Sequence, residues 1–169
     1  MADAFESLLI EAQAKQTETL VDQLSADFVG LTVSVADMGT RGLFSHWFSH
    51  HFSKQIVASL TIHHPSILIR PLGLSPKDIQ AHGKTSATTI EQVSQKFRHL
   101  TAAQLGLALG EYNENHRCFY VGISHANHTE SIVVPISEKP AGPTMDTVLG
   151  SATLVHYYMR RVRNRHSAL

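Results

Sequence analysis

The chain has 169 residues with 14 basic and 14 acidic side chains, so its formal net charge is zero. This balance argues against the broad basic surface that general nucleic-acid or anionic-membrane binding requires. A single cysteine, Cys118, excludes an intramolecular disulfide and a thiolate metal cluster. A chain of this length can bury about 70% of its unfolded surface, and we expect one domain over residues 1–169.

No targeting or membrane-spanning segment is expected. The chain opens on Met1, Ala2 and the acidic Asp3, rather than on basic residues followed by an apolar stretch. No apolar run approaches the roughly 18 residues that a transmembrane helix needs. We therefore expect a cytoplasmic protein that binds neither nucleic acid nor membrane.

The first part of the chain alternates between helix and strand. Apolar residues recur at helical spacing over residues 4–25. Residues 31–36 alternate aliphatic with small side chains, which is the period of a strand. Apolar residues return to helical spacing over residues 43–48, and residues 55–62 predict a second strand.

The second part predicts two helices before a run of strands. Ser75 and Pro76 are a typical N-cap and first-turn proline of a short helix. Thr85 or Ser86 can cap the next helix, which continues through Leu100. Three strands and a last helix follow, over residues 105–109, 118–123, 131–136 and 144–162. This order predicts a three-layer α/β/α domain with a mixed sheet.

The loop after the first strand is the strongest candidate for a functional site. It reads Asp37-Met38-Gly39-Thr40-Arg41-Gly42, and its two glycines permit a sharp reversal and a close backbone approach. A strand that enters a helix through such a loop brings backbone N–H groups and the positive end of the helix dipole together. We therefore place the candidate site at this loop.

Four stretches of the sequence carry a family resemblance. Residues 36–42 stand where the family has A-E-S-C-T-G-G, and residues 63–74 where it has Y-S-N-x-x-K-x-x-L-L-G-V. Residues 82–86 correspond to H-G-A-V-S, and residues 107–123 to L-A-V-T-G-I-A-G-P, a glycine loop and K-P-V-G-T-V-Y-I-G-L. In order and spacing the chain resembles the C-terminal domain of the CinA (competence-damage-inducible) family. The enzymatic members of that family are nicotinamide-nucleotide amidohydrolases.

The residues that carry the family's chemistry are replaced. The resemblance assigns the nucleophilic serine to the position of Met38, and a thioether has no proton to lose and forms no stable acyl adduct. The family's lysine falls at Leu68 and its tyrosine at His63, and the glycine-rich loop after Leu109 is shortened. The resemblance therefore implies a vestigial cleft formed by Asp37, Met38, Gly39, Thr40, Gly42, His63, His64 and Gly110.

This pattern predicts a paralogue that keeps the fold and has lost the hydrolysis of amides. It would act as an interaction module or bind a small nucleotide-like ligand, without a cofactor, and the resemblance implies a homo-oligomer. The alternative is an amidohydrolase with rearranged residues, in which His63 is the base and Thr40 the nucleophile. That enzyme needs the Thr40 hydroxyl within hydrogen-bond reach of His63 or His64, and free N–H groups facing the same space. Asp37 and Thr40 at a helix entrance are otherwise cap residues.

Histidines offer the remaining chemistry. His46 and His50 are four residues apart and share a helix face, so with His63 or His64 they would form a metal site. No carboxylate stands beside them at a ligand spacing. Solvent-facing histidines are the simpler interpretation, and we expect no metal.

Overall fold

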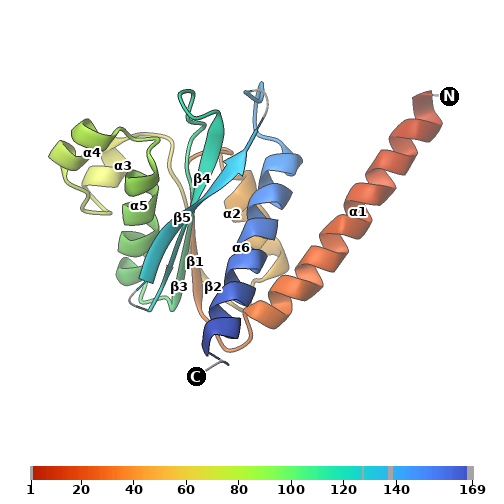
Figure 1. Cartoon of the computed structure of the whole chain (residues 1–169), viewed down its shortest axis with the longest axis horizontal. Coiled ribbons are helices and arrows are strands. Elements are labelled where there is room, and N and C mark those ends of the chain that lie inside the picture. The colour runs from red at the N-terminus through yellow and green to blue at the C-terminus, as the bar shows by residue number, and fades with distance from the viewer. Residues whose placement is uncertain (1, 127, 137–138, 167–169) are drawn as a thin grey trace.

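The structure is a computed structural model, and it describes residues 2–126, 128–136 and 139–166, with side-chain environments from residue 11 to residue 163 within these ranges. Figure 1 shows the arrangement of the elements. In chain order they are α1 (Ala2–Asp27), β1 (Val33–Asp37), α2 (Leu43–His51), β2 (Ile56–Thr61), α3 (Ser66–Ile69), α4 (Pro76–His82), α5 (Ala87–Leu100), β3 (Leu105–Leu109), β4 (Cys118–His125), β5 (His128–Pro135) and α6 (Met145–His166).

The five strands form one mixed sheet in the order β2-β1-β3-β4-β5. Strand β1 runs parallel to both neighbours, with Val35 opposite Ser59 on β2 and Leu107 on β3. Strands β3, β4 and β5 pair antiparallel. Every residue of β1 and β3 is buried, as expected for strands covered on both faces.

Helices cover both faces of this sheet. Helix α5, with α3 and α4 beside it, lies on one face, while α2 and α6 lie on the other, with α1 outside them (Figure 1). The expected three-layer α/β/α architecture with a mixed sheet is confirmed.

The two faces of the sheet differ in side-chain size. Large residues such as Leu107 and Val121 point into the core shared with α2 and α6. On the α5 side the central strands carry small residues, and two of them are glycines. A Cβ on Gly106 would lie 2.3 Å from the carbonyl oxygen of Ser94, and one on Gly122 would lie 2.5 Å from that of Ile90. Helix α5 therefore packs directly on the sheet backbone.

The predicted helix starts agree with the structure. The hydroxyl of Ser75 accepts a hydrogen bond from the backbone N–H of Asp78, and Ser86 rather than Thr85 caps α5. No helix was expected between residues 63 and 74, and the structure forms the short helix α3 there. The strands β4 and β5 also extend further into their hairpin than the apolar pattern indicated, because polar residues continue the ladder to His125 and His128.

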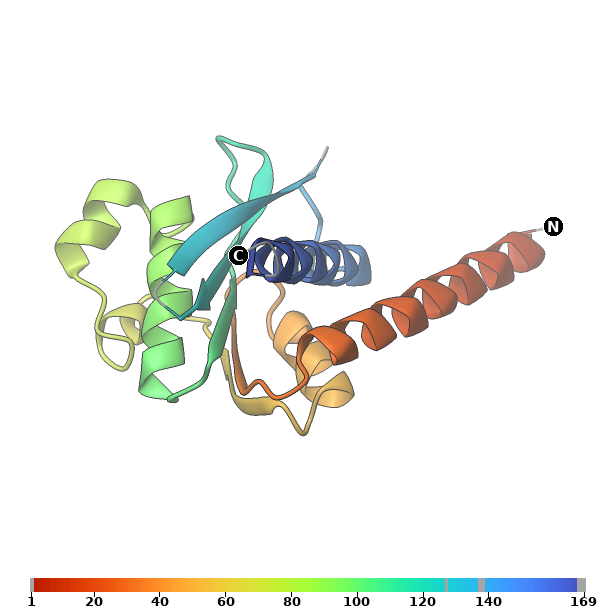
Figure 2. The same ribbon diagram turned by 60° about the horizontal axis from the view of Figure 1, so that its bottom comes forward.

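Helix α1 is anchored at its C-terminal end, and its N-terminal half extends away from the sheet (Figure 2). Leu20 and Leu24 are buried against the core. The carboxylate of Asp27 lies 2.6 Å from Nδ1 of His156 and 3.3 Å from Arg163, both on α6. The predicted apolar stripe also included Phe5, Leu8 and Leu9, whose side chains lie outside the described part of the structure. Among the described residues, no helix combines the length and apolar character needed to span a membrane.

Candidate functional site

The loop after β1 is organised by the carboxylate of Asp37, which is completely buried. Its Oδ1 accepts a hydrogen bond from the backbone N–H of Thr40 at 2.8 Å. Its Oδ2 accepts from the Thr40 hydroxyl at 2.6 Å, from the N–H of Gly42 at 2.9 Å and from the N–H of Phe44 at 3.1 Å. These donors include the first N–H groups of α2, which commonly bind anions. The protein's own carboxylate therefore fills the anion site that the loop was expected to offer.

Thr40 is committed to the same network. Its side chain is 1% exposed, and its hydroxyl donates to Asp37 while accepting from the N–H of Phe44 at 2.9 Å. The interpretation of Asp37 and Thr40 as cap residues is confirmed. His64 is engaged locally, with Nδ1 2.9 Å from the hydroxyl of Ser66. No hydrogen bond joins Thr40 to His63 or His64 in the part of the chain that the structure describes.

The loop is also pressed against the end of β3. The N–H of Met38 donates to the carbonyl oxygen of Leu109 at 2.8 Å. A Cβ on Gly39 would lie 2.1 Å from the carbonyl oxygen of Gly110, so only glycine fits there. Gly42 has φ of 99°, a left-handed conformation that glycine adopts without strain, and it is the N-cap residue of α2. The structure thus brings Met38, Gly39 and Gly110 together, as the predicted cleft required.

A pocket of about 720 Å³ opens at this end of the sheet. It lies beyond the carboxyl ends of β1 and β3. From β1 the chain crosses one face of the sheet through α2 to reach β2, and from β2 it crosses the other face through α5 to reach β3. Open α/β sheets bind ligands at such switch points. The lining residues come from five segments of the chain: Met38, Gly39 and Arg41; Ile62 and His63; Lys84 and Thr85; residues 111–115 with Phe119; and residues 139–143.

The predicted site residues divide into three groups around this pocket. Met38, Gly39 and His63 line it. Asp37 and Thr40 are buried inside the loop, where they hold its shape. Gly42, His64 and Gly110 are not part of the lining. Leu68, at the position of the family's lysine, is fully buried in the apolar cluster with Leu72 and Ile90.

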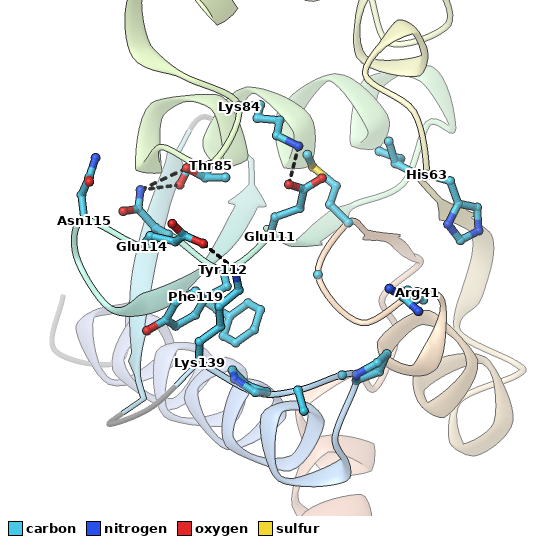
Figure 3. Close-up of a pocket in the computed structure, with 18 residues that line it drawn as sticks. Arg41, His63, Lys84, Thr85, Glu111, Tyr112, Glu114, Asn115, Phe119 and Lys139 are labelled. Carbon is cyan, nitrogen blue, oxygen red and sulfur yellow. Dashed lines mark hydrogen bonds and ion pairs between the residues drawn. The ribbon is translucent and has the colours of Figure 1, made fainter.

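Two lysine–glutamate pairs border the pocket (Figure 3). Nζ of Lys84 lies 2.6 Å from Oε2 of Glu111, and Lys139 binds Glu114. The hydrogen bond and charge of Lys139 lower the pKa of Glu114, and Glu114 in turn raises the pKa of Lys139. Each shift favours the ionised form of the group concerned.

Arg41 faces the pocket from the opposite side. Figure 3 places its guanidinium across the pocket from Lys139 and Glu114. It is exposed, and no hydrogen bond or ion pair links its side chain to any residue that the structure describes. Its backbone has φ of 53°, a left-handed conformation uncommon for a residue with a Cβ. The turn of the loop therefore sets the direction of this side chain.

Aromatic rings form an apolar wall beside these charges. The rings of Tyr112 and Phe119 meet edge to face with centroids 5.5 Å apart, and both line the pocket. The side-chain amide of Asn113 donates to the carbonyl oxygen and the hydroxyl of Thr85 at 3.0 and 3.2 Å. These hydrogen bonds join two segments of the pocket lining, residues 111–115 and the pair Lys84 and Thr85.

Sequence reasoning missed most of the charged lining. Lys84, Glu111, Glu114 and Lys139 lie in three loops far apart along the chain and share no motif. The available signal was topological, because these loops meet at one end of the sheet, beyond the carboxyl ends of β1 and β3. The family-like stretches at residues 82–86 and 107–123 did contain Lys84 and both glutamates, without any indication of their role.

On α2, His46 and His50 are exposed and His51 is half-buried. The rings of His46 and His50 stack with centroids 6.1 Å apart, and burial, followed by the charge of His50, lowers the pKa of His51. Within the described ranges, no group of three or more histidine, cysteine, aspartate or glutamate side chains is arranged to hold a metal ion.

No family model matches the sequence, and no curated protein matches it. Solved structures do resemble the fold. A competence or damage-inducible protein from Enterobacter asburiae superposes with a TM-score of 0.75 at 15% identity, over 85% of this chain and 98% of that one. A CinA superfamily protein from Klebsiella pneumoniae gives a TM-score of 0.76 at 11% identity, over 86% and 98%. A third, from Enterobacter cloacae, gives 0.67 at 19% identity, over 86% and 89%. The chain therefore has the CinA-like fold.

Proposed function

We propose that this protein is a diverged relative of the CinA-like amidohydrolases that binds a small, anionic, nucleotide-like molecule without hydrolysing it. The observation that carries the proposal is the guanidinium of Arg41, which has no partner among the residues that the structure describes. It faces a 720 Å³ pocket whose other side holds the rings of Tyr112 and Phe119. The volume lies within the roughly 300–1,000 Å³ typical of small-molecule sites.

The lining suits a molecule with one anionic end and one planar end. A guanidinium presents parallel N–H donors that match the oxygens of a phosphate or carboxylate. Phe119 and Tyr112 supply the apolar surface against which a ring can pack. Together these groups would fix both the position and the direction of a nucleotide-like ligand.

The same loop argues against amide hydrolysis. Met38 stands where an attacking oxygen would be needed. The N–H groups of Gly42 and Phe44 donate their hydrogen bonds to Asp37, so they are not free to stabilise an oxyanion. The Thr40 hydroxyl donates a hydrogen bond to Asp37 and is nearly excluded from solvent. Both facts weaken the alternative of an enzyme that uses Thr40 and His63.

The experiment is a thermal-shift and calorimetric screen of the whole chain against nucleoside monophosphates and nicotinamide mononucleotide. A ligand at about 100 times its Kd stabilises the native state by roughly 2.7 kcal/mol. We expect at least one of these compounds to raise the melting temperature. Arg41→Ala should abolish that shift, whereas Arg160→Ala, an exposed arginine on α6 that is not part of the lining, should preserve it.

An ammonia-release assay on nicotinamide mononucleotide separates the two interpretations. The binding protein should release no ammonia. Turnover at ordinary enzyme rates that disappears in both Thr40→Val and His63→Ala would establish the amidohydrolase alternative instead. The absence of any shift with every nucleotide would overturn the proposed binding function.

A further inference from the structure

One loop supplies both carboxylates of the pocket. The segment of residues 111–115, named here the acidic loop, follows β3 and carries Glu111 and Glu114. Each glutamate pairs with a lysine from a different part of the chain: Lys84 from the connection between α4 and α5, and Lys139 from the connection between β5 and α6. Besides the hydrogen bonds from Asn113 to Thr85, the acidic loop therefore contacts two separate walls of the pocket through one ion pair each.

Both ion pairs are exposed to water, so the lysine of each pair can readily exchange its carboxylate for another anion. The side chains of Lys84 and Glu111 are 46% and 35% exposed, and those of Lys139 and Glu114 are 61% and 70% exposed. Exposed ion pairs of this kind contribute little to stability, because water screens them and the side chains lose rotational freedom. A carboxylate held this weakly can be replaced by another anion of similar charge without cost to the fold.

Arg41 provides the contrast. It is a cation of the same pocket without a carboxylate partner among the described residues, so a first anionic group can bind it directly. The two lysines are different, because each is already neutralised. An incoming anion reaches them only by displacing a glutamate of the acidic loop.

We propose that Glu111 and Glu114 act as built-in competitors for Lys84 and Lys139, and that the site selects ligands carrying at least two anionic groups. The first group binds Arg41, and the further negative charge takes over the lysines from the acidic loop. A ligand with one anionic group obtains only Arg41. This inference rests on the proposed binding function and specifies the chemical class of its ligand, such as a diphosphate.

The test measures the affinity of inorganic pyrophosphate and inorganic phosphate by calorimetry at 0.1 M salt. Glu111→Gln combined with Glu114→Gln removes the competing charge and keeps the side-chain shape. This variant should bind pyrophosphate about three- to tenfold more tightly, the range expected from two exposed pairs. Lys84→Ala combined with Lys139→Ala should weaken pyrophosphate severalfold and leave phosphate within about twofold, since Arg41 still binds it.

A charge-matched control excludes a general effect of net charge. Glu18 and Glu130 are remote from the pocket lining, and Glu130 is likewise paired, with Arg161. Glu18→Gln combined with Glu130→Gln should leave both affinities unchanged, because the Debye length at this salt is only about 10 Å. Melting temperatures of all variants verify that each one folds.

The possible failures are distinguishable. If the wild type binds nucleotides through Arg41 but the glutamine variant binds pyrophosphate equally or more weakly, the competition is overturned and the binding function stands. The competition is also overturned if the lysine variant keeps its full affinity for pyrophosphate. If the wild type binds no nucleotide, phosphate or pyrophosphate, the proposed function is overturned and this inference with it.

Discussion

At the residue scale, Asp37 decides what the loop after β1 can do. Four hydrogen-bond donors converge on one buried carboxylate, and three of them are backbone N–H groups near the start of α2. A charge at this position is stabilised by the helix dipole as well as by its donors. The loop is consequently rigid, and its donors are directed inward rather than toward the pocket.

Replacement of Asp37 by asparagine should be costly. The substitution removes the charge and replaces one acceptor oxygen by an NH₂ group that faces other donors. We expect a loss of about 2–4 kcal/mol in the free energy of unfolding, since hydrogen bonds to charged groups contribute roughly 1.5–3 kcal/mol each. Urea denaturation measures it. Asp22→Asn, at an exposed position of α1, should change stability by less than about 0.5 kcal/mol, and a similar value for Asp37→Asn would contradict the role assigned to this carboxylate.

Restoring a serine at position 38 should not restore hydrolysis. Met38→Ser supplies a hydroxyl, but a serine without an activating base stays protonated at neutral pH. Catalytic groups that act as a unit give strongly non-additive effects. We therefore expect no ammonia release from Met38→Ser or from Leu68→Lys. The combination of the two should release at most a trace. Leu68→Lys also buries an ammonium in an apolar cluster, so its melting temperature must be recorded beside its activity. Robust activity of Met38→Ser alone would show that the site had lost only its nucleophile.

At the scale of elements, glycine sets the distance between α5 and the sheet. The backbone of Gly122 on β4 lies so close to α5 that a methyl group would meet the carbonyl of Ile90. Backbone atoms of a packed helix cannot move aside individually, so the whole helix would have to shift. The identity of residue 122 therefore fixes the position of α5, and with it the nearby loop that carries Lys84.

Two alanine substitutions should have opposite signs. Gly122→Ala should destabilise the fold by about 1–3 kcal/mol through overpacking. Gly150→Ala, in the interior of α6, should stabilise it by roughly 0.5–1 kcal/mol, because the nearest atom to the new Cβ, on Val134, is at an ordinary contact distance of 3.7 Å. Chemical denaturation of both variants tests the comparison. Equal effects would mean that the close approach of α5 does not limit residue 122.

At the scale of the whole molecule, periodicity predicted most of the fold. Apolar spacing gave the order of the elements, and local chemistry at Ser75 and Ser86 gave the helix starts, because a cap depends only on its next few residues. The short helix α3 was missed because four residues contain too little periodicity. Met38, Gly39 and His63 were found as pocket residues.

The rest of the site could not be read from the sequence. Glu111 and Lys84 meet only because the loop after β3 and the connection between α4 and α5 lie at the same end of the sheet. Local sequence did offer Asp37 as a cap residue, but it could not decide whether the loop N–H groups bind this carboxylate or a ligand, since that depends on the direction of the donors. Contacts between distant segments depend on the packing of the complete sheet.

The association state is a further property of the whole molecule. The resemblance to the CinA family predicted a homo-oligomer, and it remains a prediction. Light scattering coupled to size-exclusion chromatography should give a mass at least twice the 18.6 kDa of one chain. A mass of one chain at all concentrations up to about 100 μM, where even weak homodimers with a Kd near 10 μM are populated, would contradict it.

The anchoring of α1 has a consequence for synthesis on the ribosome. Asp27 binds His156 and Arg163, so the first helix is joined to the last across more than a hundred intervening residues. Domains assemble as the chain emerges, and contacts of such sequence separation form late. Leu20 and Leu24 leave the ribosome long before α6 exists to cover them. The nascent chain therefore carries the apolar residues of α1 without their packing partner until α6 has been synthesised, an interval in which a chaperone would bind them.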